Sequence, residues 1–139
     1  MTKIKSYWLL KSEPDVYGWD DLVTEGEGTW DGVRNYTARL HLRAMQVGDE
    51  AFFYHSNVGV EIVGIIKITK AGFPDPTDDT GRWTSVKVKP VRKLKRPVTL
   101  KEIKADPALA GMDLLTKFRL SISPLKLAEW EHIVALSKQ

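Results

Sequence analysis

The chain contains no cysteine. Disulfide bonds, thiolate nucleophiles and cysteine-ligated metal sites are therefore excluded, and the composition is compatible with a reducing compartment. The chain also lacks a long apolar run, because the aromatic and aliphatic stretch near the N-terminus extends only from Tyr7 to Leu10. So short a run cannot serve as a signal peptide or cross a membrane. We therefore expect a cytoplasmic protein without a membrane partner.

Several motifs of enzymes and metalloproteins are missing as well. There is no Gly-Lys-Ser or Gly-Lys-Thr for a phosphate-binding loop, and no Gly-x-Ser-x-Gly nucleophile elbow. The three histidines, His41, His55 and His132, are too widely separated to have the helical spacing of metal ligands. We expect no metal site and no bound cofactor.

The composition that remains is that of a globular protein. The chain has 139 residues, of which 42% are hydrophobic and 28% are charged, and this size allows one domain with a real core. The net charge of +3 permits a polyanionic partner but does not require one. Five tryptophans are more than such a core needs, so we expect some of them at a binding surface.

The pattern of apolar residues predicts short strands with helices inserted between them. Strands are expected at residues 4–11, 50–55, 60–69, 82–91 and 120–123. Thr99-x-x-Glu102 is a capping box that opens a short helix, and Ser123-Pro124 is predicted to begin the terminal one. This arrangement indicates an α+β domain over residues 1–139, with five or six strands in one curled, barrel-like sheet.

Residues 36–45 carry conflicting signals. Apolar and polar residues alternate as in a strand, but the residues are alanine, leucine, arginine and methionine, with no valine or isoleucine. Asn35 is a good N-cap, and we therefore predict a helix. Arg39 and Arg43 then lie one turn apart on one face, and the helix N-terminus attracts anions.

Three polar clusters are candidates for a shared site: Lys11-Ser12-Glu13, the segment from Trp30 to Asn35, and His55-Ser56-Asn57. A tryptophan face can stack on any base, and an asparagine can read a base edge. Serine hydroxyls could add further edge contacts. We therefore predict that the clusters converge on a pocket for a nucleobase. The alternative is that Trp30 belongs to the core and Asn35 only caps a helix.

The charged residues also have two interpretations. Lys11 and Glu13 could form a buried acid–base pair, or they could simply face water at the end of a strand. The densest basic cluster could hold phosphates, or its lysines could protect the edge of the sheet against association. That cluster consists of Lys87, Lys89, Arg92, Lys93, Lys95, Arg96, Lys101 and Lys104.

Nearly the whole chain resembles the EVE-domain family. The matching stretches are YWLLKSEPDVYGWDDL, WDGVRNYTARLHLRAM, VGDEAFFYHSN, VGIIKI with PDPTDDTGRW, PVTLKEIKADPAL and RLSISPLKLAEW. The resemblance implies a PUA-like fold, with a curled, mostly antiparallel β-barrel and flanking short helices. This fold is related to that of the YTH readers of methylated adenine. Relatives in modification-dependent restriction systems read modified cytosine in DNA.

The resemblance thus implies a monomeric, non-enzymatic module that binds DNA or RNA carrying a modified base, with modified cytosine as the expected target. The implied base pocket consists of Lys11, Ser12, Glu13, Trp30, Gly32, Val33, Arg34, Asn35, His55, Ser56, Asn57, Arg119, Leu120 and Ser121. The phosphates are assigned to Arg34, Arg39, Arg43, Lys87, Lys93 and Lys95. Two alternatives stay open: a small hydrolase of modified nucleosides similar to the ASCH amidohydrolases, and a sensor of a free small molecule.

Overall fold

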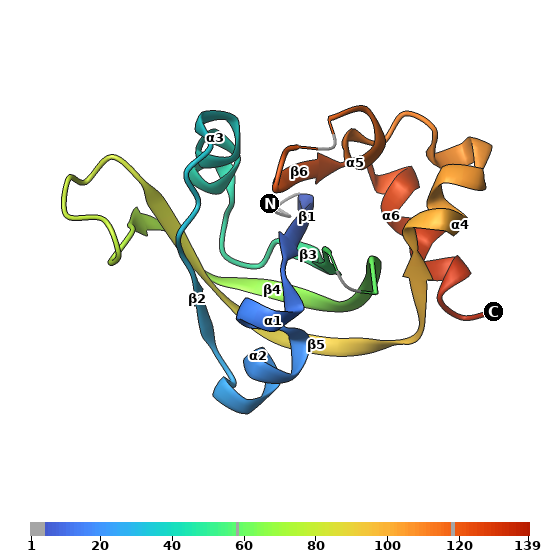
Figure 1. The fold of residues 1–139 in the computed structure, drawn as a ribbon, viewed down its shortest axis with the longest axis horizontal. Helices are drawn as coiled ribbons and strands as arrows, with labels where there is room; N and C mark the ends of the chain where they lie inside the picture. Colours follow the sequence, from blue (N-terminus) through green and yellow to red (C-terminus); the bar gives the residue numbers. More distant parts are fainter. Residues whose placement is uncertain (1–4, 58, 118) are drawn as a thin grey trace.

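The structure is a computed structural model that describes residues 5–57, 59–117 and 119–139. Its centre is an open six-stranded mixed sheet with the strand order β2-β5-β4-β3-β1-β6 (Figure 1). The strands are β1 (Tyr7–Ser12), β2 (Gly28–Trp30), β3 (Glu50–His55), β4 (Glu61–Pro74), β5 (Thr84–Thr99) and β6 (Ile122–Leu125). The helices are α1 (Pro14–Tyr17), α2 (Trp19–Glu25), α3 (Tyr36–Ala44), α4 (Leu100–Ala105), the 3-10 helix η1 (Pro107–Leu109), α5 (Asp113–Thr116) and α6 (Leu127–Leu136).

The predicted fold class is confirmed. The chain forms a six-stranded α+β fold in which β1 pairs with β3 in parallel and the other described strand pairs are antiparallel. The sheet stays open, with β2 and β6 at its two edges. Ile4 was expected to lie in the first strand, but it is outside the described residues. Within the described ranges, the helices are too short or too polar to cross a membrane.

Both faces of the central strands are buried. Successive side chains on a strand point to opposite faces, so the continuous apolar stretches of β1 and β3 supply two cores. Leu10 and Phe53 belong to one core, together with residues of α2 and α3. Leu9 and Phe52 belong to the other core, where the Trp130 ring of α6 stacks on Phe52 with 4.0 Å between the ring centroids. Figure 1 shows α3 and the bundle α4–α6 at separate parts of the sheet.

The helix predicted at residues 36–45 is confirmed. The Asn35 side chain accepts a hydrogen bond from the Ala38 backbone N–H at 2.9 Å, as an N-cap does. Ala38 and Leu42 are buried against the sheet, while Arg39 and Arg43 follow one another on the outer part of the helix. For this segment, the scarcity of β-branched residues is thus a better predictor of secondary structure than the strand-like alternation of apolar and polar residues.

Strands β4 and β5 are longer than predicted. Strand β5 contains prolines, and the sheet accommodates Pro90 at an irregularity in the pairing. Pro90 lies opposite Ile66, next to a register shift between Ile65 and Ile66. A bulge tolerates the missing N–H of proline, so the strand continues. The short strand β2 was not predicted, because its first residue, Gly28, ends the glycine-containing stretch Glu25-Gly26-Glu27-Gly28, which is typical of a loop.

The prediction that Ser123-Pro124 begins the terminal helix is wrong. Both residues lie in β6, where Pro124 is opposite Trp8. A proline is tolerated there because β6 is an edge strand that pairs only with β1 among the described strands. Helix α6 begins at Leu127, and the Glu129 carboxylate accepts a hydrogen bond from the Lys126 backbone N–H at 2.9 Å.

Candidate functional site

A cavity of about 770 Å³ lies between the end of β1 and the segment that joins β2 to α3. It brings together two of the predicted polar clusters, Lys11-Ser12-Glu13 and the segment from Trp30 to Arg34, and adds Ser121 from the approach to β6. The remaining wall is made by Val16, Tyr17, Glu25, Glu27 and Thr29. Strands β1 and β2 are not neighbours in the sheet, but Leu10 of β1 and Trp30 of β2 belong to the same core.

Trp30 is both a wall of this cavity and part of the core. Its side chain is only 7% exposed, and its ring meets the rings of Phe53 and Tyr17 edge-on at 5.4 and 6.2 Å between centroids. Edge-to-face contacts of this kind are favourable in a packed interior. Trp30 therefore offers a ligand a fixed apolar surface.

Tyr17 was not predicted as a site residue. Its hydroxyl donates a hydrogen bond to the Glu25 carboxylate, and its backbone carbonyl accepts one from the Ser12 hydroxyl at 2.5 Å. Burial, followed by the bond to Glu25, raises the pKa of Tyr17 well above its ordinary value, so its hydroxyl stays protonated. The one trace of this arrangement in the sequence is the glycine at position 28. A Cβ there would lie 2.2 Å from the Tyr17 hydroxyl oxygen, so the tyrosine ring requires a residue without a side chain.

Burial also shifts the pKa of two further ionisable groups in the cavity. Burial lowers the pKa of Lys11, which is half-buried near the end of β1. Burial also raises the pKa of Asp31, and the nearby Asp75 carboxylate adds to that effect. Both shifts have the same physical cause, since a charge loses hydration inside the cavity wall.

Arg34 is anchored to the loop between β4 and β5. Its Nη1 donates to Asp75 Oδ2 at 2.9 Å, and its Nη2 donates to Thr77 Oγ1 at 3.1 Å. The backbone N–H of Gly32 donates to the same Asp75 oxygen at 2.8 Å. Gly32 has a φ of 75°, which other residues seldom adopt, and this explains the glycine after Asp31.

Other predicted pocket residues lie outside this cavity. Asn35 lines a second cavity of about 500 Å³, whose wall includes Arg119 and Leu120. Ser56 lines a third cavity of about 420 Å³ that has Lys11 in common with the first. His55 accepts a hydrogen bond from the Trp19 backbone N–H at 3.1 Å, and Asn57 occupies a turn with a φ of 69°. The predicted set is therefore divided among neighbouring sites.

Apart from Arg34, the residues assigned to phosphates form two groups. Arg39 and Arg43 reach from α3 to the β4–β5 loop, where both donate to the Arg82 carbonyl and Arg43 also donates to Thr84 Oγ1. Lys87, Lys93 and Lys95 lie along β5. Lys87 Nζ is 3.9 Å from a Glu27 oxygen, whereas Lys93 and Lys95 lie beyond the part of β5 that pairs with β2. Among the described strands, that part of β5 pairs only with β4, which is compatible with either interpretation of these lysines.

No group of three histidine, aspartate or glutamate side chains suited to a metal ion occurs within the described part of the chain. The cavity beside Trp30 contains four carboxylates and two cations, and most of these side chains lie at its rim. Such a lining can accept hydrogen bonds from an amine and repels phosphate.

The open sheet, the flanking short helices and this cavity define an α+β fold of the PUA-like class. The chain belongs to the EVE domain family, which matches residues 6–136. It is 38% identical to human thymocyte nuclear protein 1, over 100% of this chain and 77% of that protein. The alignment supports the family assignment independently of the fold.

Solved structures agree with this assignment. The protein Rpa0253 from Rhodopseudomonas palustris is 47% identical, with a TM-score of 0.91 and coverage of 96% of this chain and 93% of that one. The human THYN1 protein, solved in complex with DNA containing 5-methylcytosine, is 37% identical, with a TM-score of 0.88 and coverage of 97% and 99%. The YTH domain of Zygosaccharomyces rouxii MRB1 has a TM-score of 0.57 at 14% identity, over 97% of this chain and 85% of that one, and shows likeness of fold alone.

Proposed function

We propose that this protein is a non-enzymatic module that binds a modified cytosine of DNA or RNA in the cavity beside Trp30. The observation that carries the proposal is the meeting of the Lys11–Glu13 and Trp30–Arg34 segments around one cavity of about 770 Å³. The complex of the similar human THYN1 protein with DNA containing 5-methylcytosine supports a ligand of this kind.

The charge of the cavity favours a base over a phosphate. Glu13, Glu25, Glu27 and Asp31 contribute four carboxylates to its lining, against the two cations Lys11 and Arg34. A carboxylate accepts a hydrogen bond from the exocyclic amine of cytosine, whereas it repels an anion. The electrostatics therefore select an amine-bearing base and leave the phosphates outside the cavity.

Glu13 is the carboxylate to which we assign the reading of that amine. Glu25 is held by the Tyr17 hydroxyl, and Glu27 is held by Thr69 Oγ1 at 2.7 Å. The Glu13 side chain makes no hydrogen bond or ion pair with the residues that the structure describes. In the proposal, the ring packs on Trp30, and Glu13 accepts from the amine.

Binding of four free nucleosides tests this assignment: 5-methyl-2′-deoxycytidine, 2′-deoxycytidine, thymidine and 5-methylcytidine. Thymidine has the same methyl group, but a carbonyl replaces the amine. We expect a preference of about 10- to 200-fold for the methylated over the unmethylated cytosine, as a pocket for one small apolar group provides. We expect thymidine to bind at least about 10-fold more weakly, since a hydrogen bond to a charged group is lost.

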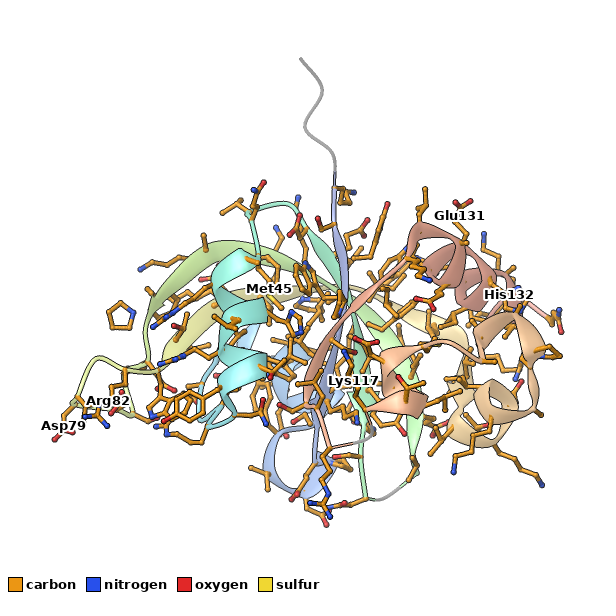
Figure 2. All side chains as sticks on the ribbon, turned by 90° about the horizontal axis from the view of Figure 1, so that it is seen from above. Met45, Asp79, Arg82, Lys117, Glu131 and His132 are labelled. Atoms are coloured by element: carbon orange, nitrogen blue, oxygen red, sulfur yellow. The ribbon has the colours of Figure 1, made fainter. Side chains whose placement is uncertain are left out.

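The variant Glu13→Gln separates the preference for the amine from the preference for the methyl group. It should reduce discrimination against thymidine and leave discrimination against the unmethylated base intact. Glu131→Gln is the matched control, because Glu131 is exposed on α6 at the far end of the molecule (Figure 2). If the wild-type protein binds thymidine as tightly as 5-methyl-2′-deoxycytidine, the amine is not read and the cytosine assignment is wrong.

One observation favours the hydrolase alternative. Lys11 lines the cavity, and burial lowers its pKa, which is the direction of change that acid–base chemistry by a lysine requires. Incubation of the protein with acylated and methylated cytidines, followed by mass spectrometry, decides between the two. We expect every nucleoside to be recovered unchanged. Release of an acyl group that is abolished by Lys11→Ala would establish an enzyme instead.

A further inference from the structure

A pair of aromatic rings, Tyr36 and the half-buried Trp83, lies next to the base cavity, where α3 meets the β4–β5 loop. The rings of Tyr36 and Trp83 are 5.3 Å apart between centroids and are inclined by 34°. Tyr36 is 67% exposed, although it is a large aromatic residue at the first position of a helix. Figure 2 shows Asp79 and Arg82, which belong to this loop, at the opposite end of the molecule from Glu131 and His132.

Arginines hold these rings in place. The Arg39 guanidinium carbon lies 4.9 Å from the Tyr36 ring centroid and 5.3 Å from that of Trp83. Arg39 Nη1 also donates to the Arg82 carbonyl at 2.9 Å, which fixes the guanidinium beside both rings. Arginines next to exposed aromatic rings are the combination with which proteins bind unpaired nucleotides, because bases stack on the rings and the cations attract phosphates.

Arg34 connects the ring pair to the base cavity. It lines the cavity, and its guanidinium carbon lies 5.6 Å from the centroid of the Trp83 ring. The two features are therefore separated by a single side chain. The carboxylates of the cavity repel phosphate, so the backbone of a bound strand has to lie outside it. The neighbouring cations lie beside the ring pair, and the backbone is therefore expected to run in that direction.

The carboxylates of the loop do not cancel this attraction. Asp75 is buried and paired with Arg34. Asp78 accepts hydrogen bonds from the loop's own Thr80, Arg82 and Trp83. Asp79 is exposed at the tip of the loop (Figure 2).

We infer that Tyr36, with Trp83 and Arg39, is a second stacking site, which takes the nucleotide next to the modified base in an unpaired strand. This inference rests on the proposed function, because the first base has to occupy the cavity beside Trp30. The protein therefore binds at least two consecutive nucleotides, and the second is held through its ring and its phosphate without regard to sequence.

The test compares 5-methyl-2′-deoxycytidine with single-stranded pentanucleotides of DNA and RNA that carry 5-methylcytosine at the centre. Binding of each probe is measured for the wild-type protein and for Tyr36→Ala, Tyr36→Phe and Leu40→Ala. Leu40 is the matched control, because it lies one turn further along α3, is 59% exposed, and belongs to neither the ring pair nor the cation–π contacts.

We expect Tyr36→Ala to weaken binding of the pentanucleotides about 5- to 150-fold, the usual effect of losing one base–aromatic stack. Binding of the nucleoside should not change. Tyr36→Phe should keep the affinity of the wild type, since it keeps the ring, and Leu40→Ala should have no effect. The DNA and RNA arms show which backbone the site prefers.

Two results would overturn the inference while leaving the proposed function intact. One is equal affinity of the wild-type protein for the nucleoside and the pentanucleotide, which would show that the protein contacts the modified base and no neighbouring nucleotide. The other is pentanucleotide binding that is unaffected by Tyr36→Ala, or affected equally by Leu40→Ala. Failure of the wild-type protein to bind the nucleoside and both pentanucleotides would instead reject the proposed function, and the inference with it.

Discussion

Arg34 and Asp75 form an ion pair that fastens the base cavity to the β4–β5 loop. Arg34 Nη1 lies 2.9 Å from Asp75 Oδ2, and the Asp75 carboxylate is fully buried. The same carboxylate accepts hydrogen bonds from the backbone N–H groups of Gly32 and Thr77. One buried charge thus sets the position of the segment after Trp30 and of the loop that carries Trp83.

We expect this carboxylate to make stability depend on acid pH. Burial by itself raises the pKa of Asp75, but the bonds from Thr77, Arg34 and Gly32 outweigh it and lower the pKa to about 2. Because the pKa is depressed in the folded state, the contribution is complete above about pH 4 and is lost as the pH falls toward 2. The size of the shift corresponds to about 2 kcal/mol.

Urea unfolding of the wild type and of Asp75→Asn at several values between pH 7 and pH 2.5 measures this contribution. The variant should be less stable at pH 7 and should approach the wild type at the acid end. Asp79→Asn is the control, since Asp79 is exposed at the loop tip. Parallel pH curves for wild type and Asp75→Asn would contradict the prediction.

Trp30→Ala should lower the free energy of unfolding by about 3–5 kcal/mol, the usual cost of removing a large aromatic side chain from a core. Trp30 is 7% exposed and packs on Phe53, so the cavity left behind is only partly filled by neighbours. Leu127→Ala, at a position that is 55% exposed, should cost less than about 0.5 kcal/mol. Denaturant unfolding of both variants decides the point, and a loss as small as that of Leu127→Ala would place Trp30 outside the core.

Gly28→Ala should disturb the cavity without touching any charged group. The new Cβ would lie 2.2 Å from the Tyr17 hydroxyl oxygen, so the ring must shift and its bond to Glu25 must weaken. We expect a loss of about 1–3 kcal/mol in stability, as overpacking costs, together with weaker nucleoside binding. Gly111→Ala is the control, because a Cβ there meets no atom within 4 Å. Equal behaviour of the two variants would show that Tyr17 does not shape the cavity.

The double variant Lys93→Gln with Lys95→Gln tests the predicted phosphate contacts on β5. If both lysines contact phosphates of a single strand, the slope of log affinity against log salt should fall by about 1.4, at about 0.7 for each contact. Binding of the nucleoside should stay the same. Lys126→Gln, an exposed lysine before α6, is the control. An unchanged slope would show that these lysines do not contact phosphates, and protection of the sheet edge against association would remain as their role.

The sequence by itself determined the features that depend on neighbouring residues. The cap at Asn35 and the composition of residues 36–45 were sufficient for α3. The capping box of Thr99 and Glu102 likewise predicted the start of α4. These signals can be recognised in the sequence because a cap, a helical face and the alternation of a strand involve residues only a few positions apart.

Only the tertiary structure decided which of the polar clusters meet. It brought Lys11–Glu13 and Trp30–Arg34 to one cavity and placed Asn35 and Ser56 in the walls of two others. It also paired Arg34 with Asp75, 41 positions away. Strand order, register and bulges determine such contacts, and these depend on how both faces of the sheet are buried at once. Local propensity does not depend on that packing, so the ion-pair partner of Arg34 could not be predicted from the residues around it in the sequence.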